Sequence, residues 1–267
     1  LAFERALEGK ALRGSYALEL GICHLQLGRV GRAREVFDAW LDEEGDGARS
    51  HLEIARRYRD ARRYDDALRH YRRVLRDAIQ ELDEAYGEAA EVMGRRGDRD
   101  GLLELTEAYL ARARNEVRAR EQAAARLADG GLREEAVKQW RQVLALRPNS
   151  STALKKLADL LYTLGRAGEA AAYVAQLIEE GGGGPKAWLE AGRALRARGA
   201  FDESLEFFGR ALDASDDRTR VQLERAEVLL ALGRQADAQE AMDDAITSAR
   251  SKRSPLEEAG ELLERFD

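Results

Sequence analysis

The sequence predicts an all-α fold, a solenoid of antiparallel helix pairs, from three observations. Glycines recur every 34 residues at Gly131, Gly165, Gly199 and Gly233. Small residues recur seven positions before these glycines, and the apolar residues around them follow the i, i+3, i+4, i+7 spacing of one helix face. A fixed period of this length is typical of proteins in which each repeat packs only against its neighbours.

The glycine column marks the turn between the two helices of each repeat. It continues toward the N-terminus at Gly97 and Gly28, whereas Arg62 stands in the intervening turn after a one-residue shift. Glycine adopts the left-handed conformation that closes many helices without strain, so these positions predict tight turns. The small residues before the turns let two helices approach closely. They are Gly21, Ala55, Ala90, Ala124, Ala158, Gly192 and Ala226.

Apolar spacing predicts a helix on each side of every turn. Leu154, Leu157 and Leu161 mark a first helix, and Ala170 with Val174 marks the second helix that follows it. The period gives seven complete repeats over residues 14–252. They start at residues 14, 48, 83, 117, 151, 185 and 219.

The two ends and one repeat depart from this pattern. Residues 1–13 match the second helix of an upstream repeat, and residues 253–267 match a capping helix or the start of a further repeat. We therefore expect this region to belong to a longer protein. In the repeat that starts at residue 83, Leu102 replaces a small residue, so we expect that helix pair to be wedged open or the following helix displaced.

Composition and motifs exclude several functions. A net charge of −6 argues against a protein that coats nucleic acid, and no apolar run reaches the roughly 18 to 20 residues of a membrane span. One cysteine and three histidines argue against a metal cluster. No nucleophile with its base, metal motif or phosphate loop is present, so we expect neither catalysis nor a cofactor. The arginine excess suggests a bacterial source, and we expect a cytoplasmic location, with a periplasmic one as the alternative.

The repeat from Pro185 resembles a tetratricopeptide repeat. The residues that follow that family's pattern are Trp188, Ala191, Gly192, Leu195, Gly199, Phe201, Ser204, Phe208, Ala211 and Leu212. The resemblance covers nearly the whole chain and implies a right-handed superhelical solenoid. It also implies a concave face, lined by the first helices, that binds an extended peptide or a helix of a partner protein.

The partner-binding positions of that family select a first group of candidates. In the repeat from residue 48 they are Arg49, Leu52, Arg56, Arg59 and Asp60. Two interpretations stand. The arginines pair with acidic residues of the next repeat, Glu84 and Glu91, which we favour, or they bind carboxylates of an acidic partner.

A second group of candidates spans the two adjacent repeats from residues 151 and 185, which have cations on their first helices. It consists of Lys155, Tyr162, Lys186, Leu189, Arg193 and Arg196. The lysines partly resemble a family clamp for the C-terminal carboxylate of chaperones. That clamp needs asparagine where Asp159 and Glu190 stand, so we reject it and keep a basic pocket for an acidic group. We expect apolar anchors at Leu18, Leu52, Leu189 and Leu223.

The histidines and a cluster of arginines are further features of the sequence. We predict that His24 and His51 form a packed pair and that His70 lies on the surface. Many arginines lie between residues 57 and 76, but interleaved aspartates disfavour a nucleic-acid or membrane patch there.

The sequence therefore predicts a protein–protein interaction scaffold that binds a partner peptide or helix, with an acidic peptide as one option. The alternatives are a regulatory arm of a longer multidomain signalling enzyme and an architectural subunit of a large complex.

Overall fold

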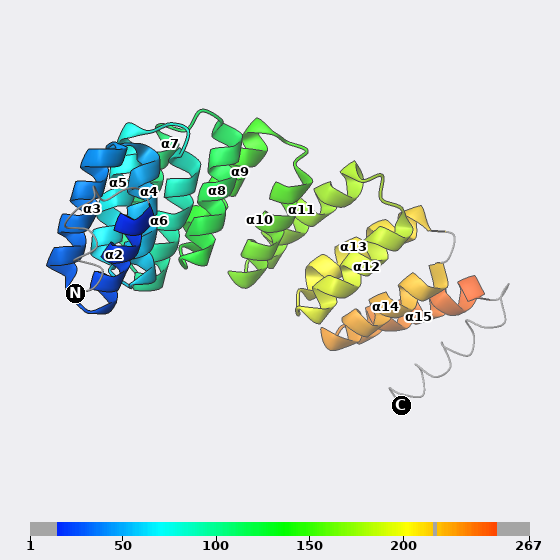
Figure 1. The fold of residues 1–267 in the computed structure, drawn as a ribbon. Helices are drawn as coiled ribbons and strands as arrows, with labels where there is room; N and C mark the ends of the chain where they lie inside the picture. Colours follow the sequence, from blue (N-terminus) through cyan, green and yellow to red (C-terminus); the bar gives the residue numbers. More distant parts are fainter. Residues whose placement is uncertain (1–14, 216–217, 250–267) are drawn as a thin grey trace. The chain divides into compact units, whose positions relative to one another are not determined.

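A computed structural model describes residues 15–215 and 218–249, and this part of the chain consists of helices joined by short turns, without a strand (Figure 1). The predicted all-α architecture of antiparallel helix pairs is confirmed. Contacts divide the chain into two compact units, Leu1–Val143 and Leu144–Asp267. We call these unit 1 and unit 2.

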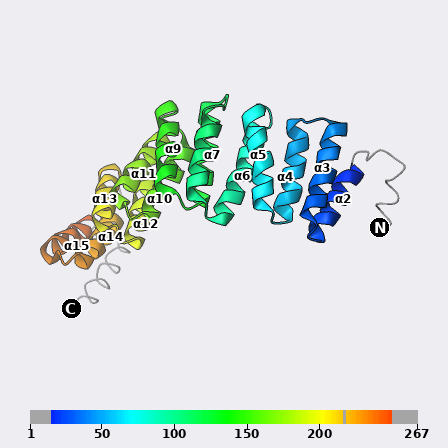
Figure 2. The same cartoon turned by 90° about the vertical axis from the view of Figure 1, so that its left-hand side faces the viewer.

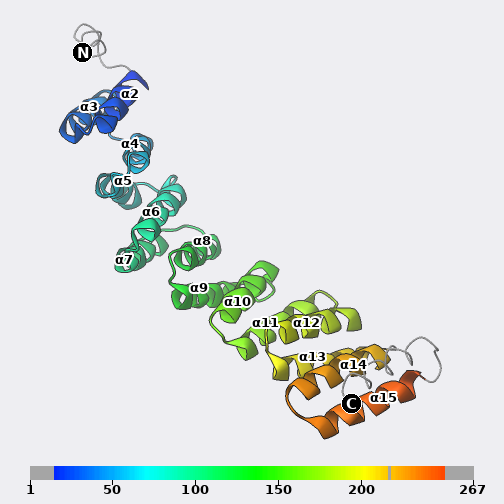
Figure 3. The ribbon, with the colours of Figure 1, turned by 90° about the horizontal axis from the view of Figure 1, so that it is seen from below.

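Unit 1 contains two rows of helices. Figure 2 shows α3 to α7 one after another along the unit, and Figure 3 shows the first helices α2, α4, α6 and α8 in one row and the second helices α3, α5 and α7 in the other. The division between the units falls within α9. The bounds are α2 Ser15–Gln26, α3 Val30–Glu44, α4 Ala48–Asp60, α5 Tyr64–Asp77, α6 Leu82–Arg96, α7 Arg99–Leu110, α8 Glu116–Asp129 and α9 Arg133–Leu146.

Unit 2 repeats the arrangement with three further pairs, in which α10, α12 and α14 are the first helices. Its core holds Trp188, Phe207 and Phe208, which are at most 7% exposed. The bounds are α10 Ser151–Thr163, α11 Ala167–Glu180, α12 Pro185–Ala197, α13 Phe201–Ala214, α14 Arg218–Ala231 and α15 Gln235–Ala249.

The turns show why the glycine column exists. Glycines of that column have φ near +70°, for example +73° at Gly165 and +74° at Gly199. Arg62 occupies the corresponding turn between α4 and α5 with φ 57°, and it is the only non-glycine with positive φ in the described residues. The left-handed conformation is therefore required at this position even where the residue carries a Cβ.

Close helix approach explains the small residues of the first helices. A Cβ placed on Gly21 would lie 2.1 Å from the ring of Phe37, and one on Gly192 would lie 2.5 Å from the ring of Phe208. Both aromatic rings come from the second helix of the same pair and are buried. The space left by the missing side chain is thus filled by an aromatic ring.

Leu102 loosens its helix pair, as its size predicts. The side chain is 1% exposed, and α7 packs less closely against α6 than α5 packs against α4. Leu102 is accommodated at Gly130, the residue after α8, where an added Cβ would lie 2.4 Å from Leu102 Cδ2. Contacts of α6 and α7 with α8 hold the group together.

The repeat boundaries stay a prediction. The predicted half-repeats at residues 1–13 and 253–267 lie outside the described residues.

Candidate partner-binding face

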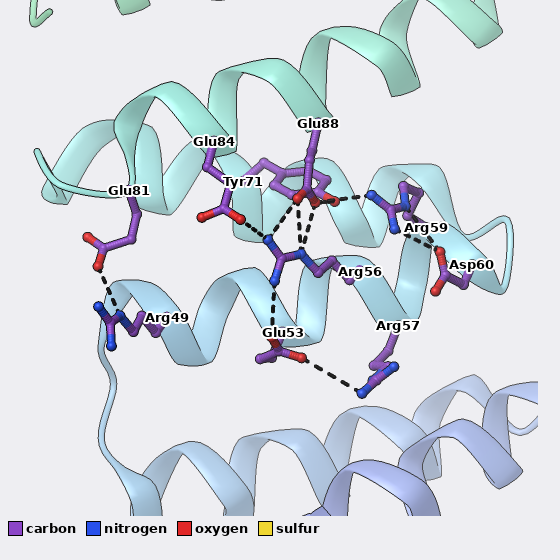
Figure 4. Close-up of polar contacts among 10 residues, drawn as sticks. All are labelled: Arg49, Glu53, Arg56, Arg57, Arg59, Asp60, Tyr71, Glu81, Glu84 and Glu88. Atoms are coloured by element: carbon purple, nitrogen blue, oxygen red, sulfur yellow. Dashed lines mark hydrogen bonds and ion pairs between the residues drawn. The ribbon is translucent and has the colours of Figure 1, made fainter.

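An ion-pair ladder joins α4 to α6 on the side formed by the first helices, which we call the first-helix face (Figure 4). Arg56 donates from Nε to Glu88 Oε1 at 3.0 Å and from Nη1 to Glu53 Oε1 at 3.0 Å, and it also pairs with Glu84. Arg59 Nη1 reaches Glu88 Oε2 at 3.1 Å. Two arginines of one first helix therefore converge on one carboxylate of the next.

A tyrosine hydroxyl completes the environment of Glu88. Tyr71, from the second helix α5, donates its hydroxyl to Glu88 Oε2 at 2.8 Å. Burial opposes ionisation of Glu88, but the hydrogen bonds from Arg56 and Tyr71 outweigh it, so the pKa of Glu88 is lowered. Burial, together with the bond to this carboxylate, raises the pKa of Tyr71. The hydroxyl thus remains a donor and the carboxylate remains ionised.

Unit 2 contains a second ladder at the equivalent repeat positions. Arg193, on α12, donates from Nε to Glu224 Oε1 of α14 at 2.6 Å. Arg196 Nη1 lies 3.0 Å from Glu224 Oε2 and also pairs with Glu227. The Glu224 side chain is 14% exposed. Although its Oε2 is within ion-pair distance of Arg196, it has no hydrogen bond of acceptable geometry in the described part of the chain.

The arginines therefore pair within the protein, as the favoured interpretation states, although with partly different residues. Glu88 takes the place that we expected for Glu91, which instead pairs with Arg95 one helical turn away at 2.6 Å. Arg49 makes only a 3.4 Å contact with Glu81, and its side chain is 88% exposed.

The expected apolar anchors need correction. Leu18, Leu52 and Leu223 are 8%, 2% and 6% exposed, so they belong to the core and cannot reach a partner. Helix positions predicted to point outward face neighbouring helices here, because each first helix packs on its second helix and on the adjacent pair. Leu189 is partly buried against the unit 2 core and remains accessible.

The remaining candidates lie on α10 and α12. Lys155 is exposed and has no ion-pair partner among the described residues, and Lys186 is 87% exposed with Glu190 at 3.9 Å. Tyr162 is partly buried, with the Arg198 guanidinium 4.8 Å from its ring centroid.

The structure contains a packed histidine pair, but its members are not the two that we predicted from the sequence. His51 and His70 face each other, with their Nδ1 atoms 2.8 Å apart, and His51 Nε2 lies 2.5 Å from Asp46 Oδ1. Because a carboxylate only accepts, His51 donates from Nε2, and its neutral tautomer accepts from His70 at Nδ1. Burial, with nearby His51 and Arg69, lowers the pKa of His70 to about 4.

His70 is thus not a surface residue, and its partner is not His24. The repeat period contained the signal, because the same two positions hold Trp188 and Phe207 in unit 2, whose rings also contact each other. Within the described residues, no group of three or more His, Cys, Asp or Glu side chains is arranged to hold a metal ion. None of the helices in these ranges has the length and apolar character needed to traverse a membrane.

Comparisons with solved structures find the following proteins among those similar to this chain. MamA (residues 41 to the end) from Desulfovibrio magneticus RS-1 is 19% identical, with 66% of this chain and 100% of that chain covered and a TM-score of 0.38. A tetratricopeptide repeat protein from Parabacteroides merdae ATCC 43184 is 18% identical, with 76% and 80% covered and a TM-score of 0.44. YrrB, a TPR protein with an unusual peptide-binding site, is 18% identical, with 67% and 92% covered and a TM-score of 0.40.

A search of curated proteins finds no match. The tetratricopeptide repeat family, whose members typically form non-enzymatic scaffolds for protein interaction, matches residues 1–48, 121–185, 176–219 and 189–255. These matches span more than half of the sequence and include the repeat whose residues carry the resemblance. The chain belongs to the tetratricopeptide repeat family.

Proposed function

We propose that this protein is an interaction scaffold that binds an acidic segment of a partner protein on the first-helix face of unit 2, through exposed cations near the beginnings of the first helices. The observation that carries the proposal is a division among those cations. Arg56, Arg59, Arg193 and Arg196 are held in the two ladders, whereas Arg49, Lys155 and Lys186 extend into solvent.

The two sets of cations serve different purposes. If a ligand drew Arg56 away from Glu88, a partly buried carboxylate would lose its main partner. This free-energy cost opposes binding of a ligand by the ladder arginines. Their charge reversal would therefore test stability more than binding. The lysines of α10 and α12 can contact a partner carboxylate without breaking the core.

Accessible apolar surface adjoins these lysines. Leu189 follows Lys186 by three residues, and Tyr162 lies two helical turns after Lys155. Both side chains pack partly against the unit 2 core and keep one side accessible. A partner segment with carboxylates and apolar side chains would match this combination, with the charges setting orientation and the apolar groups adding affinity.

Affinity capture from a lysate of the source cells, with the full chain as bait, tests this proposal. The bait is compared with a Lys155→Glu, Lys186→Glu double variant and with Lys138→Glu, a matched reversal on the second helix α9, where Lys138 is 72% exposed. Retention of a partner by the wild type and by Lys138→Glu, with loss from the double variant, supports the site. Equal retention by all three contradicts the site, and absence of any retained partner contradicts the scaffold proposal.

A further inference from the structure

A row of arginines on the opposite side of unit 1 defines a second surface. Arg69, Arg72, Arg73 and Arg76 follow the i, i+3, i+4, i+7 spacing on the second helix α5, so they share one face. We call this row the arginine ridge. Arg69 and Arg76 are 61% and 68% exposed, and Arg72 is also exposed.

The carboxylates near the ridge are too few to pair with it fully. Asp66 is shared by Arg34, Arg63 and Arg69, at 3.1 to 3.3 Å. Asp77 is shared by Arg73 and Arg76, and Arg73 also pairs with Asp46. Arg72 has neither a hydrogen bond nor an ion pair with any residue that the structure describes. Like charges one helical turn apart destabilise an isolated helix, so the ridge has a cost that a bound acidic group would relieve.

An apolar cleft of about 340 Å³ lies beside the ridge, between α5 and α7. Leu75 and Leu105 line it, and the small residues Gly101 and Ala108 leave it open. Arg72, Arg76 and Arg112 surround it, with Glu104 as the one acidic residue of the lining. The cleft thus combines an apolar interior with a cationic rim.

Exposed apolar surface continues past the end of α5. The Arg112 guanidinium donates to the carbonyl oxygen of Ala78 at 3.4 Å, and the next residue, Ile79, is 45% exposed. A second cleft of about 790 Å³ borders the other side of the ridge, and Arg72 and Arg76 line both clefts.

We propose that the cleft between α5 and α7 is a second docking site, distinct from the first-helix face, for an acidic amphipathic segment of a partner protein. One or two apolar side chains of that segment enter the cleft between Leu75 and Leu105. Its carboxylates bind Arg72, Arg76 and Arg112 through charge-assisted hydrogen bonds, for which guanidinium geometry is well suited.

Charge and shape favour a protein segment over nucleic acid. Asp77 and Glu104 interrupt the positive surface, whereas a phosphate backbone needs an uninterrupted basic footprint. The whole chain carries a net charge of −6. The apolar interior of the cleft also offers nothing to a phosphate backbone, while it matches an aliphatic side chain.

Selection from a phage library of random 16-residue peptides tests the site with the full chain as target. Three variants are compared with the wild type. Arg72→Glu with Arg112→Glu reverses the rim, Ala108→Trp fills the cleft without changing charge, and Lys155→Glu with Lys186→Glu alters the first-helix face as the control. Circular dichroism verifies that each variant is folded.

The expected result is a class of acidic peptides with apolar side chains that bind the wild type and the first-helix-face control equally. These peptides should bind at least about tenfold more weakly to the rim variant and to Ala108→Trp, and more weakly as salt increases. Absence of such a class, or equal binding to all variants, overturns the proposal. Tighter binding of a mixed-sequence 20-base-pair DNA duplex than of any selected peptide also overturns it. Because the control variant alters only the first-helix face, the experiment distinguishes a failure of the first-helix-face proposal from a failure of the cleft proposal.

Discussion

The pair α4–α5 in unit 1 and the pair α12–α13 in unit 2 place chemically different residues at the same repeat positions. Where unit 2 has Trp188 against Phe207, with ring centroids 5.3 Å apart, unit 1 has His51 against His70 at 5.1 Å. The next position of the second helix is Tyr71 in unit 1 and Phe208 in unit 2. The repeat positions are shared, but unit 1 has hydrogen bonds and a titratable ring where unit 2 has aromatic rings, with the Arg210 guanidinium 4.9 Å from the centroid of the Trp188 ring.

The ladders differ in the same way. Glu88 accepts from two arginines and from the hydroxyl of Tyr71, whereas Phe208 has no hydroxyl to offer Glu224. The same repeat positions thus accept polar residues in unit 1 and aromatic residues in unit 2, and in unit 1 the polar groups of His51, His70 and Tyr71 are hydrogen-bonded. The comparison predicts that the stability of unit 1 depends on pH and on individual hydrogen bonds more strongly than the stability of unit 2.

The largest expected difference is a selective loss of stability of α4–α5 on acidification. His70 has a folded-state pKa of about 4, below the ordinary value of 6.5, so the unfolded chain binds the additional proton between these values. The contribution of neutral His70 to the stability of α4–α5 is therefore complete above pH 6.5 and is lost as the pH falls toward 4. The loss is about 3 kcal/mol, at roughly 1.4 kcal/mol per pKa unit. Amide hydrogen exchange at pH 7 and pH 5, corrected for intrinsic rates, measures the part of this loss expected by pH 5, about 2 kcal/mol.

Importing the aromatic pair of unit 2 provides the control. The His51→Trp, His70→Phe double variant should remove this part of the pH dependence in α4–α5 and leave α12–α13 unchanged. An unchanged pH dependence in the double variant would show that other groups, such as the carboxylates of the ladder, cause it.

Removing the acceptor of each ladder should affect unit 1 more than unit 2. Glu88→Ala leaves Arg56, Arg59 and Tyr71 without a common partner, and we expect a loss of about 2 kcal/mol in the opening free energy of α4–α6. Glu224→Ala should cost about 1 kcal/mol in α12–α14, because no hydroxyl is left unpaired there. Hydrogen exchange of these helices measures both losses, and equal losses would contradict the difference between the ladders.

The hydroxyl of Tyr71 should account for about 1.5 kcal/mol of unit 1 stability. Tyr71→Phe removes a hydrogen bond to a charged group while keeping the ring. The effect is measured by urea unfolding of unit 1, followed by hydrogen exchange, in the wild type and in the Glu88→Ala background. If the substitution costs the same in both backgrounds, the hydroxyl does not act through Glu88.

The smallest effect concerns the turns. Arg62→Gly should stabilise α4–α5 by roughly 1 kcal/mol, because φ 57° is strained for a residue with a Cβ. Gly199→Arg, at the equivalent turn of unit 2, should destabilise α12–α13 by a similar amount. Thermal unfolding of both variants tests this exchange. If Arg62→Gly does not stabilise the protein and Gly199→Arg does not destabilise it, the turns relax at little cost in free energy.

The fold was predictable because it depends on local repeats. The glycine at each turn and the small residue seven positions earlier reflect backbone constraints within one helix pair, so one sequence displays them several times. The site was predicted only in part. The pattern placed Arg56 and Arg59 on the first-helix face, but which carboxylate they reach depends on the rotation of α6 relative to α4, and they pair with Glu88 and not with Glu91.

The sequence by itself determined the helix pairs, their turns and the family, since the 34-residue period records which residues must be small, apolar or glycine. Only the tertiary structure decided that Leu52 is buried, that Arg56 and Arg59 reach Glu88, and that Arg72, which pairs with none of the described residues, lies beside an apolar cleft. These features depend on contacts between successive helix pairs. Such contacts are set by side-chain packing across the interface, and no spacing within a single repeat encodes them.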